Sequence, residues 1–146
     1  MPVTTASREC TDTKLRQLLR SIGRDYEAEL APEGIQVTQY SLLARLMALG
    51  PQRPTDFAKL TRMQLSTLSR NLRPLQSAGW LKVQPGEDGR SRLISVTPQG
   101  RAKMLQVRER WASAQAKLAS KAGSSRLAAL HRLIDEILES LELHRN

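Results

Sequence analysis

Residues 64–78 read QLSTLSRNLRPLQSA and are followed by Gly79. Leucines recur at steps of three and four, which predicts an amphipathic helix that ends at the glycine. The other face carries serine, threonine, asparagine and arginine but no acidic residue, which is unusual for a solvated surface. Pro74 removes one backbone donor, so we expect a bend or a looser last turn. The apolar face consists of Leu65, Leu68, Leu72 and Leu75.

The periodicity changes after this helix. Residues 80–84 and 90–96 alternate loosely between apolar and polar side chains, as strands do, and residues 85–89 (PGEDG) are a dense turn signal. Together they predict a two-stranded hairpin with a basic tip, which must lean on the helices because such a hairpin is marginal alone. Further helices are predicted at residues 14–30, 38–49, 55–60 and 98–122, and from 124 or 125 to 143.

Short polar residues mark the expected starts of these helices. Residues 11–13 offer caps for the first helix and Thr38 for the second. Thr97 caps the helix that begins with proline, and Ser124 or Ser125 caps the last one. The helix at 55–60 is expected to turn three side chains inward: Phe57, Ala58 and Leu60.

Composition narrows the class of protein. The 146 residues are 40% hydrophobic and only 3% aromatic, and they carry a formal net charge of +9. This is too apolar for a disordered basic tail, and no apolar run reaches the roughly 20 residues that span a membrane. The first 13 residues show no apolar signal segment, so we expect a cytoplasmic protein. Excess positive charge indicates a polyanionic partner, most often nucleic acid.

The positive charge is concentrated in the middle of the chain. Residues 53–103 carry ten basic and three acidic residues, a net charge of +7, whereas residues 1–34 and 124–146 carry −1 each. Phe57 and Trp80 are the only aromatic residues of the basic segment. Proteins that read RNA or single strands usually stack bases on aromatic side chains, so the pattern favours duplex DNA.

Four short motifs follow one another through this segment. They are residues 66–72 (STLSRNL), the helix exit 78–81 (AGWL), the turn 88–92 (DGRSR) and the strand end 96–100 (VTPQG). With these motifs, residues 55–100 resemble the winged helix-turn-helix core of the MarR family of bacterial transcription regulators. Three residues depart from the commonest family pattern: Pro74 interrupts the recognition helix, and Trp80 and Val96 stand where an aliphatic residue and a leucine are usual.

The resemblance implies a mainly α fold with a small β-hairpin: a winged helix-turn-helix with long N- and C-terminal dimerisation helices. Residues 35–100 would bind DNA, and residues 1–34 and 101–146 would form the dimer arms. The implied protein is a homodimeric transcription regulator that binds a pseudo-palindromic operator in double-stranded DNA. We expect this regulator to be a repressor. An architectural or weakly specific DNA-binding protein on the same fold is the alternative.

Carried over residue by residue, the resemblance assigns contacts with DNA. Arg90 would enter the minor groove at the wing, braced by Asp88, while Ser91 and Arg92 support phosphate contacts. Arg62 is a further candidate phosphate contact. The expected major-groove contacts are Gln64, Ser66, Thr67, Ser69, Arg70, Asn71 and Arg73. The apolar positions expected to dimerise are Leu15, Leu18, Leu19, Ile22, Leu127, Leu130, Ile134, Ile137 and Leu141.

Weaker signals leave alternatives open. Cys10, the only thiol, is either a candidate oxidation sensor or an incidental surface cysteine. Four side chains either line a pocket for a small-molecule effector or belong to the helix-packing core: Tyr26, Tyr40, Met47 and Trp111. The sequence offers neither a paired nucleophile and base nor a cluster of metal ligands, so we expect no enzyme, no metal and no cofactor.

Overall fold

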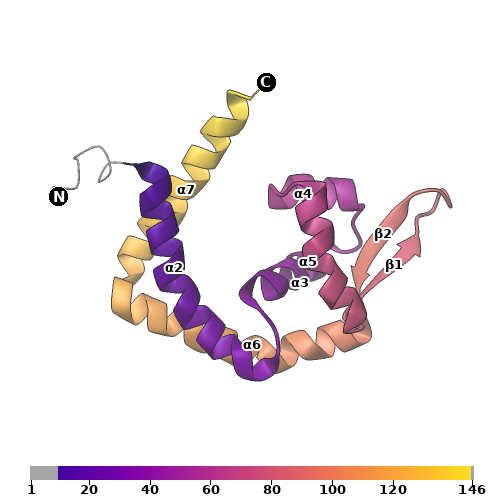
Figure 1. Ribbon diagram of the computed structural model, residues 1–146, viewed down its shortest axis with the longest axis horizontal. Helices are drawn as coiled ribbons and strands as arrows, with labels where there is room; N and C mark the ends of the chain where they lie inside the picture. The colour runs from indigo at the N-terminus through magenta and orange to yellow at the C-terminus, as the bar shows by residue number, and fades with distance from the viewer. Residues whose placement is uncertain (1–9, 146) are drawn as a thin grey trace, which may run out of the picture. The chain divides into compact units, whose positions relative to one another are not determined.

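The structure is a computed structural model that describes residues 10–145. It confirms the mainly α fold with one small antiparallel hairpin (Figure 1). None of the helices within the described residues is long and apolar enough to cross a membrane. The elements are α2 (Thr11–Leu30), η1 (Ala31–Glu33), α3 (Val37–Leu49), α4 (Pro54–Thr61), α5 (Leu65–Ser77), β1 (Leu81–Pro85), β2 (Arg92–Val96), α6 (Pro98–Ala122) and α7 (Ser124–Leu143).

The chain divides into two compact units. Unit 2 comprises Tyr26–Trp111, and unit 1 comprises the described residues up to Asp25 and from Ala112 onward. Helices α2 and α6 each contribute to both units, because the boundaries fall inside them. We describe each unit by itself.

Unit 2 has a hydrophobic core formed by α3, α4, α5, the hairpin and the first half of α6. The inward face of α5 is confirmed, since Leu68, Leu72 and Leu75 are buried. Leu65 is 45% exposed, because it begins the helix one turn ahead of Leu68 and lies past the edge of the core. These leucines fix which face of α5 remains in contact with solvent.

The prediction for Leu60 is wrong, because this residue is 50% exposed. Phe57 and Ala58 are buried as expected, and the third inward position of α4 is Thr61 rather than Leu60. The Thr61 hydroxyl donates to the carbonyl oxygens of Phe57 (2.8 Å) and Ala58 (3.2 Å). A polar residue therefore closes the inner face of this short helix by bonding its own backbone.

The hairpin pairs Leu81 with Val96 and Pro85 with Arg92, so each strand begins later than the sequence predicts. The Trp80 backbone serves the helix exit instead: its N–H donates to Leu75 (3.0 Å) and its carbonyl accepts from Thr97 (3.0 Å). A single bridge adds support to the outer edge of the hairpin, because Gln52 and Ile94 exchange two backbone bonds of 3.0 and 2.8 Å. The hairpin thus leans on unit 2, as its marginal stability requires.

The start of α6 is confirmed in detail. The Thr97 hydroxyl accepts from the N–H of Gly100 (3.0 Å) and donates to the carbonyl of Gly79 (2.5 Å). Gly100 cannot be another residue without rearrangement, since an added Cβ would lie 2.2 Å from the Trp80 carbonyl oxygen. The motif VTPQG therefore joins the start of α6 to the end of α5.

Three other caps differ from the predictions. Residues 11–13 lie inside α2, whose first backbone bond joins Lys14 N–H to the Cys10 carbonyl (3.1 Å). Thr38 lies inside α3, which begins after Gln36; the Gln36 N–H donates to the Gln39 side chain (2.9 Å). Ser124 is the first residue of α7 rather than its cap, because the preceding glycine already makes the turn. Sequence proximity alone does not identify which polar residue caps a helix.

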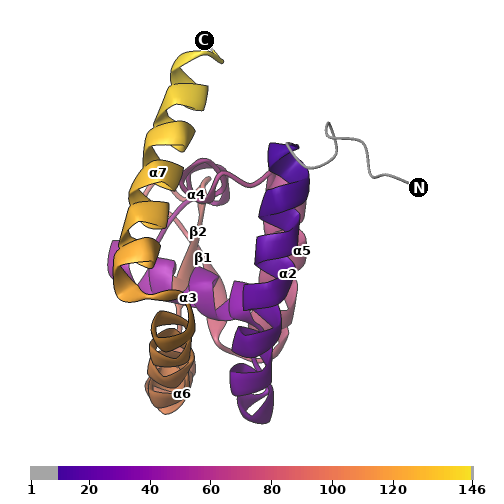
Figure 2. The same cartoon turned by 90° about the vertical axis from the view of Figure 1, so that its left-hand side faces the viewer.

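Unit 1 has almost no core of its own. Among the described residues, Ala114 is its only buried apolar side chain. Figure 2 shows α2 and α7 as two separate helices. The ends of α2 and α6 within this unit are joined by an ion pair between Lys121 Nζ and Asp25 Oδ2 (2.7 Å).

Candidate nucleic-acid interface

Helix α5 presents a polar and basic face to solvent. Its centre consists of four exposed side chains: Ser66, Ser69, Arg70 and Arg73. These residues lie opposite the buried leucines, as steps of three and four require. The face has a width and a donor and acceptor content that suit the major groove of duplex DNA.

Thr67 and Asn71 lie at the flank of this face and are half-buried. The Asn71 amide nitrogen donates to the Thr67 carbonyl oxygen, 2.9 Å away and one turn back in the same helix. This bond uses one of the two N–H groups of the amide, so the other N–H and the amide oxygen are the groups with which Asn71 would meet a base edge. The sequence alone did not separate these two flanking residues from the exposed centre.

Hydrogen bonds to the backbone hold the turn before α5. Arg62 adopts a left-handed conformation (φ 56°), and its N–H donates to the Lys59 carbonyl (3.1 Å). The Met63 N–H donates to Ala58 (2.9 Å), and Arg45 Nη1 donates to the Leu60 carbonyl (2.9 Å). Arg62 and Gln64 are exposed beside the N-terminus of α5, where a helix dipole favours an anion such as phosphate.

The end of α5 is closed despite Pro74. The Ala78 N–H donates to the Pro74 carbonyl (3.0 Å). Gly79 (φ 77°) donates to Gln76 and Trp80 donates to Leu75, each at 3.0 Å, which together form a Schellman motif. The last turn is therefore closed by hydrogen bonds and not looser, although these bonds do not replace the one to the Arg70 carbonyl that Pro74 cannot make. The alternative, a bend at Pro74, stays a prediction.

Asp88 organises the tip of the hairpin. Its Oδ1 accepts the N–H of Arg90 (3.0 Å), the N–H of Ser91 (2.8 Å) and the hydroxyl of Ser91 (2.7 Å). These bonds, those to Ser91 first, lower the pKa of the Asp88 carboxyl to about 2. The carboxylate thereby fixes the backbone from which the Arg90 side chain projects.

The side chain that Asp88 pairs with is Arg53, which the sequence analysis missed. Arg53 Nη2 lies 3.9 Å from Asp88 Oδ2, and both side chains are about half exposed (55% and 51%). Asp88 was expected to brace the Arg90 side chain; in the structure its contacts with Arg90 are to the backbone. Arg53 immediately precedes α4, so the pair links the start of the helix-turn-helix to the tip of the hairpin.

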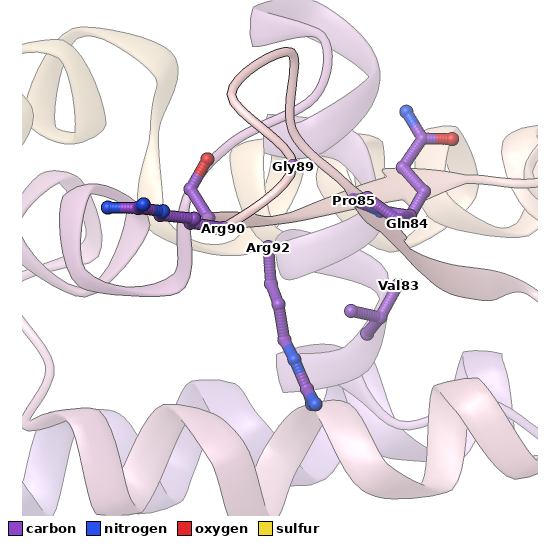
Figure 3. Close-up of a pocket in the computed structure, with 7 residues that line it drawn as sticks. Val83, Gln84, Pro85, Gly89, Arg90 and Arg92 are labelled. Carbon is purple, nitrogen blue, oxygen red and sulfur yellow. The ribbon is translucent and has the colours of Figure 1, made fainter.

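A surface hollow of about 520 Å³ lies along the hairpin. Figure 3 shows Arg90 projecting away from the loop, Arg92 and Val83 on one side of the hairpin and Gln84 on the other. Arg90 and Arg92 are exposed and Ser91 is half-buried. The hollow is lined by Val83, Gln84, Pro85, Gly89, Arg90, Ser91 and Arg92. Two arginines on one small ribbon suit contact with phosphates.

The candidate effector residues form a packed cluster in unit 2. Tyr40 stacks on Trp111 with ring centroids 4.3 Å apart, and Tyr26 meets Trp111 edge-on at 5.1 Å. Both tyrosines are buried, and burial raises the pKa of each hydroxyl. Met47 and Trp111 pack against the same core. This packing favours the core interpretation of the four residues.

Cys10 is exposed at the start of α2. Hydrogen bonding from the Thr13 side chain and backbone lowers the pKa of its thiol. Among the described residues, no group of three His, Cys, Asp or Glu side chains is placed to hold a metal ion.

The expected dimer positions are mostly exposed in the single chain. Leu19 is 71% exposed, and Ile137 and Leu141 are 56% and 55% exposed. Leu15, Leu18 and Ile134 are exposed to lesser extents, while Ile22, Leu127 and Leu130 are half-buried.

The chain is similar to known DNA-binding regulators. Residues 35–91 match the sequence model of the MarR family. The uncharacterized HTH-type transcriptional regulator YwoH of Bacillus subtilis (strain 168) is 26% identical over 94 residues, covering 64% of this chain and 69% of YwoH. The multiple antibiotic resistance protein MarR of Salmonella typhimurium is 29% identical over 111 residues, covering 75% of this chain and 77% of that protein.

A solved structure extends the match to nearly the whole chain. The transcriptional regulator MosR of M. tuberculosis, in complex with DNA, is 28% identical and superposes with a TM-score of 0.82. The match covers 94% of this chain and 100% of that one. It includes the flanking helices as well as the segment that carries the hairpin.

Proposed function

This chain belongs to the MarR family of winged helix-turn-helix transcription regulators, and we propose that it acts as a homodimeric repressor on a pseudo-palindromic operator in double-stranded DNA. The observation that supports this proposal is the presence of two exposed basic surfaces within unit 2, with the hairpin tip held by Asp88 and paired to Arg53 at the start of α4. One is the face of α5 that the buried leucines leave exposed, and the other is the hairpin tip.

Sequence would be read by α5. Arg70 and Arg73 have a planar guanidinium group that can donate to the O6 and N7 of guanine. The hydroxyl groups of Ser66 and Ser69 can donate to or accept from the edge of any base. Thr67 and Asn71 add contacts from the flank of the helix. Gln64 and Arg62 would hold phosphates at the N-terminus of α5, which fixes the register of the helix in the groove.

The hairpin would serve as the wing. Arg90 projects from the turn that Asp88 fixes, and a narrow minor groove attracts arginine through its negative potential. Ser91 and Arg92 would contact phosphates beside it. These contacts carry affinity and salt dependence rather than sequence choice.

The two ends of the chain would form the dimer. The exposed leucines and isoleucines of α2 and α7 supply a large apolar surface that a second copy can cover. In this division of labour residues 1–34 and 101–146 dimerise and residues 35–100 bind DNA. A two-fold symmetric dimer places two recognition helices roughly 34 Å apart, about one turn of DNA.

Repression would be relieved by a change in the spacing of the two DNA-binding domains. Such a change requires an effector that prefers one spacing over the other. A small ligand near the Tyr26, Tyr40 and Trp111 cluster and oxidation of Cys10 are the two candidate triggers. If Cys10 is the trigger, peroxide weakens operator binding of the parent chain but not of Cys10→Ser.

We expect no catalytic activity, and we place the protein with the DNA in the cytoplasm. The alternative function is architectural: a dimer that coats duplex DNA with little sequence preference. The experiment that separates the two is a binding titration at fixed salt against the upstream DNA of the protein's own gene and against the same duplex shuffled. We expect at least tenfold tighter binding to the native sequence, and equal affinity would favour the architectural function.

A further inference from the structure

Lys103 on α6 contacts two segments of unit 2 that are far apart in the sequence. Its ammonium group donates to the backbone carbonyl of Glu33 in η1. The same nitrogen lies 5.4 Å from the centroid of the Trp80 ring, within the range of a cation–π interaction. One half-buried cation therefore joins the corner after α2 to the exit of α5.

Trp80 is firmly attached to the end of α5. Its N–H closes the Schellman motif at Leu75, and its carbonyl accepts the N–H of Thr97. The carbonyl also lies so near Gly100 that no Cβ fits there. A displacement of Trp80 must therefore displace the last turn of α5 and the first turn of α6.

The corner after α2 has a second attachment to α6. Arg110 Nε lies 3.1 Å from Glu33 Oε1, and the Glu33 side chain is only 16% exposed. Lys103 and Arg110 are seven residues apart, about two turns of helix, so they lie on the same face of α6. The corner is thus held at two points along α6, and one of them also holds Trp80.

We propose that Lys103 is a positioning residue, which sets the orientation of the recognition helix through the face of Trp80. The proposal rests on the proposed function, because operator affinity is one of its readouts. Trp80 stands where the family pattern, by resemblance, has an aliphatic residue. An aliphatic side chain has no π face for a cation. The contact between Lys103 and Trp80 is therefore tied to the position at which this chain departs from the family pattern.

The first test compares Lys103→Met, Lys103→Arg and the surface control Lys14→Met, on the exposed surface of α2, in operator binding over a series of salt concentrations. Methionine keeps the apolar stem and removes the cation. We expect Lys103→Met to weaken binding about fivefold with an unchanged salt slope, and Lys103→Arg to restore the affinity. A loss of about 0.9 in the salt slope would show that Lys103 contacts a phosphate instead, and parent-like affinity would also overturn the proposal.

The second test is a double-mutant cycle between Lys103→Met and Trp80→Leu, measured by urea unfolding of the full chain without DNA. We expect the second substitution to cost clearly less once the first is present, because both remove the same interaction. Additive losses would overturn the proposal. This arm needs no DNA, so it tests the contact between Lys103 and Trp80, on which the proposal depends, even if the parent chain shows no operator preference and the proposed function fails.

Discussion

Unit 1 and unit 2 contain similar apolar side chains but use them differently. In unit 2 leucines from α3 and α5 meet Phe57 and Ala58 of α4 in one core, and among the described residues almost every buried apolar side chain lies there. In unit 1 most leucines and isoleucines of α2 and α7 are exposed and the others are half-buried, while Ala114 is the one buried apolar side chain among the described residues. Unit 2 thus has a core within one chain, whereas unit 1 presents the apolar surface that the proposed dimer would cover.

The largest effect is expected from a charge placed in the apolar surface of unit 1. Ile134→Glu should dissociate the dimer and weaken operator binding roughly a hundredfold, because a carboxylate would be buried in the seam. Sedimentation velocity measures the dissociation. Leu49→Glu is the matched control, since Leu49 is a large exposed residue on α3 in unit 2 and lies outside the segments proposed to dimerise. Equal behaviour of the two variants would break the distinction between the units.

A charge removed from the wing should weaken binding without changing assembly. Arg90→Ala should lower the affinity for every duplex about thirtyfold and reduce the salt slope by about one. Arg20→Ala, on the exposed surface of α2 in unit 1, removes the same charge and should have little effect. Comparable losses in both variants would mean that total charge, rather than the wing, determines affinity.

A residue removed from the centre of α5 should relax sequence choice. Arg70→Ala should reduce the ratio of operator to shuffled-DNA affinity about tenfold, since one bidentate base contact is worth about 1–3 kcal/mol. Asn71→Ala should do the same to a smaller degree, because its amide nitrogen already bonds Thr67. Binding to a set of single-base operator variants measures both. A larger effect at Asn71 would mean that the flank of α5, rather than its exposed centre, contributes most to base recognition.

The smallest effect should come from Asp88→Ala, but its direction is informative. Removing a negative charge near DNA should tighten binding on electrostatic grounds alone, and Glu87→Ala is the neighbouring control for that term. We expect Glu87→Ala to bind equally or slightly tighter, and Asp88→Ala to bind about fivefold more weakly because the turn loses three hydrogen bonds. Tighter binding by Asp88→Ala would contradict the role of this carboxylate.

The pKa of Asp88 sets the pH range of this contribution. The value of about 2 lies below the ordinary 3.8, so the carboxylate stabilises the folded wing above pH 3.8, and that stability is lost as the pH falls toward 2. Changes in operator affinity between pH 5 and pH 8 should therefore be the same in the parent and in Asp88→Ala.

Local patterns in the sequence predicted the elements well. Leucine spacing identified the buried face of α5, and the Thr97 and Gly100 pattern identified the start of α6, because both signals act within one or two helical turns. Leu60 failed because the inward face of a short helix also admits Thr61, whose hydroxyl bonds its own backbone. Hydrophobicity alone therefore does not predict whether Leu60 or Thr61 faces the core.

Contacts between distant residues had no signal in the sequence. Arg53 and Asp88 are separated by 35 positions, and Lys103 and Glu33 by 70, so neither pair follows from periodicity. The same holds for the Gln52 bridge that supports the hairpin. The helices and the hairpin motif were therefore predictable, while these contacts between distant residues were not.

The most direct test of the central claim is a selection of bound sequences from a random duplex library with the purified full chain. If unit 1 brings two copies of unit 2 onto one operator, the selected DNA contains an inverted repeat whose half-sites are about 10 bp apart from centre to centre. Enrichment of a single unrepeated half-site would contradict the dimer, and no enrichment at all would contradict sequence-specific reading by α5.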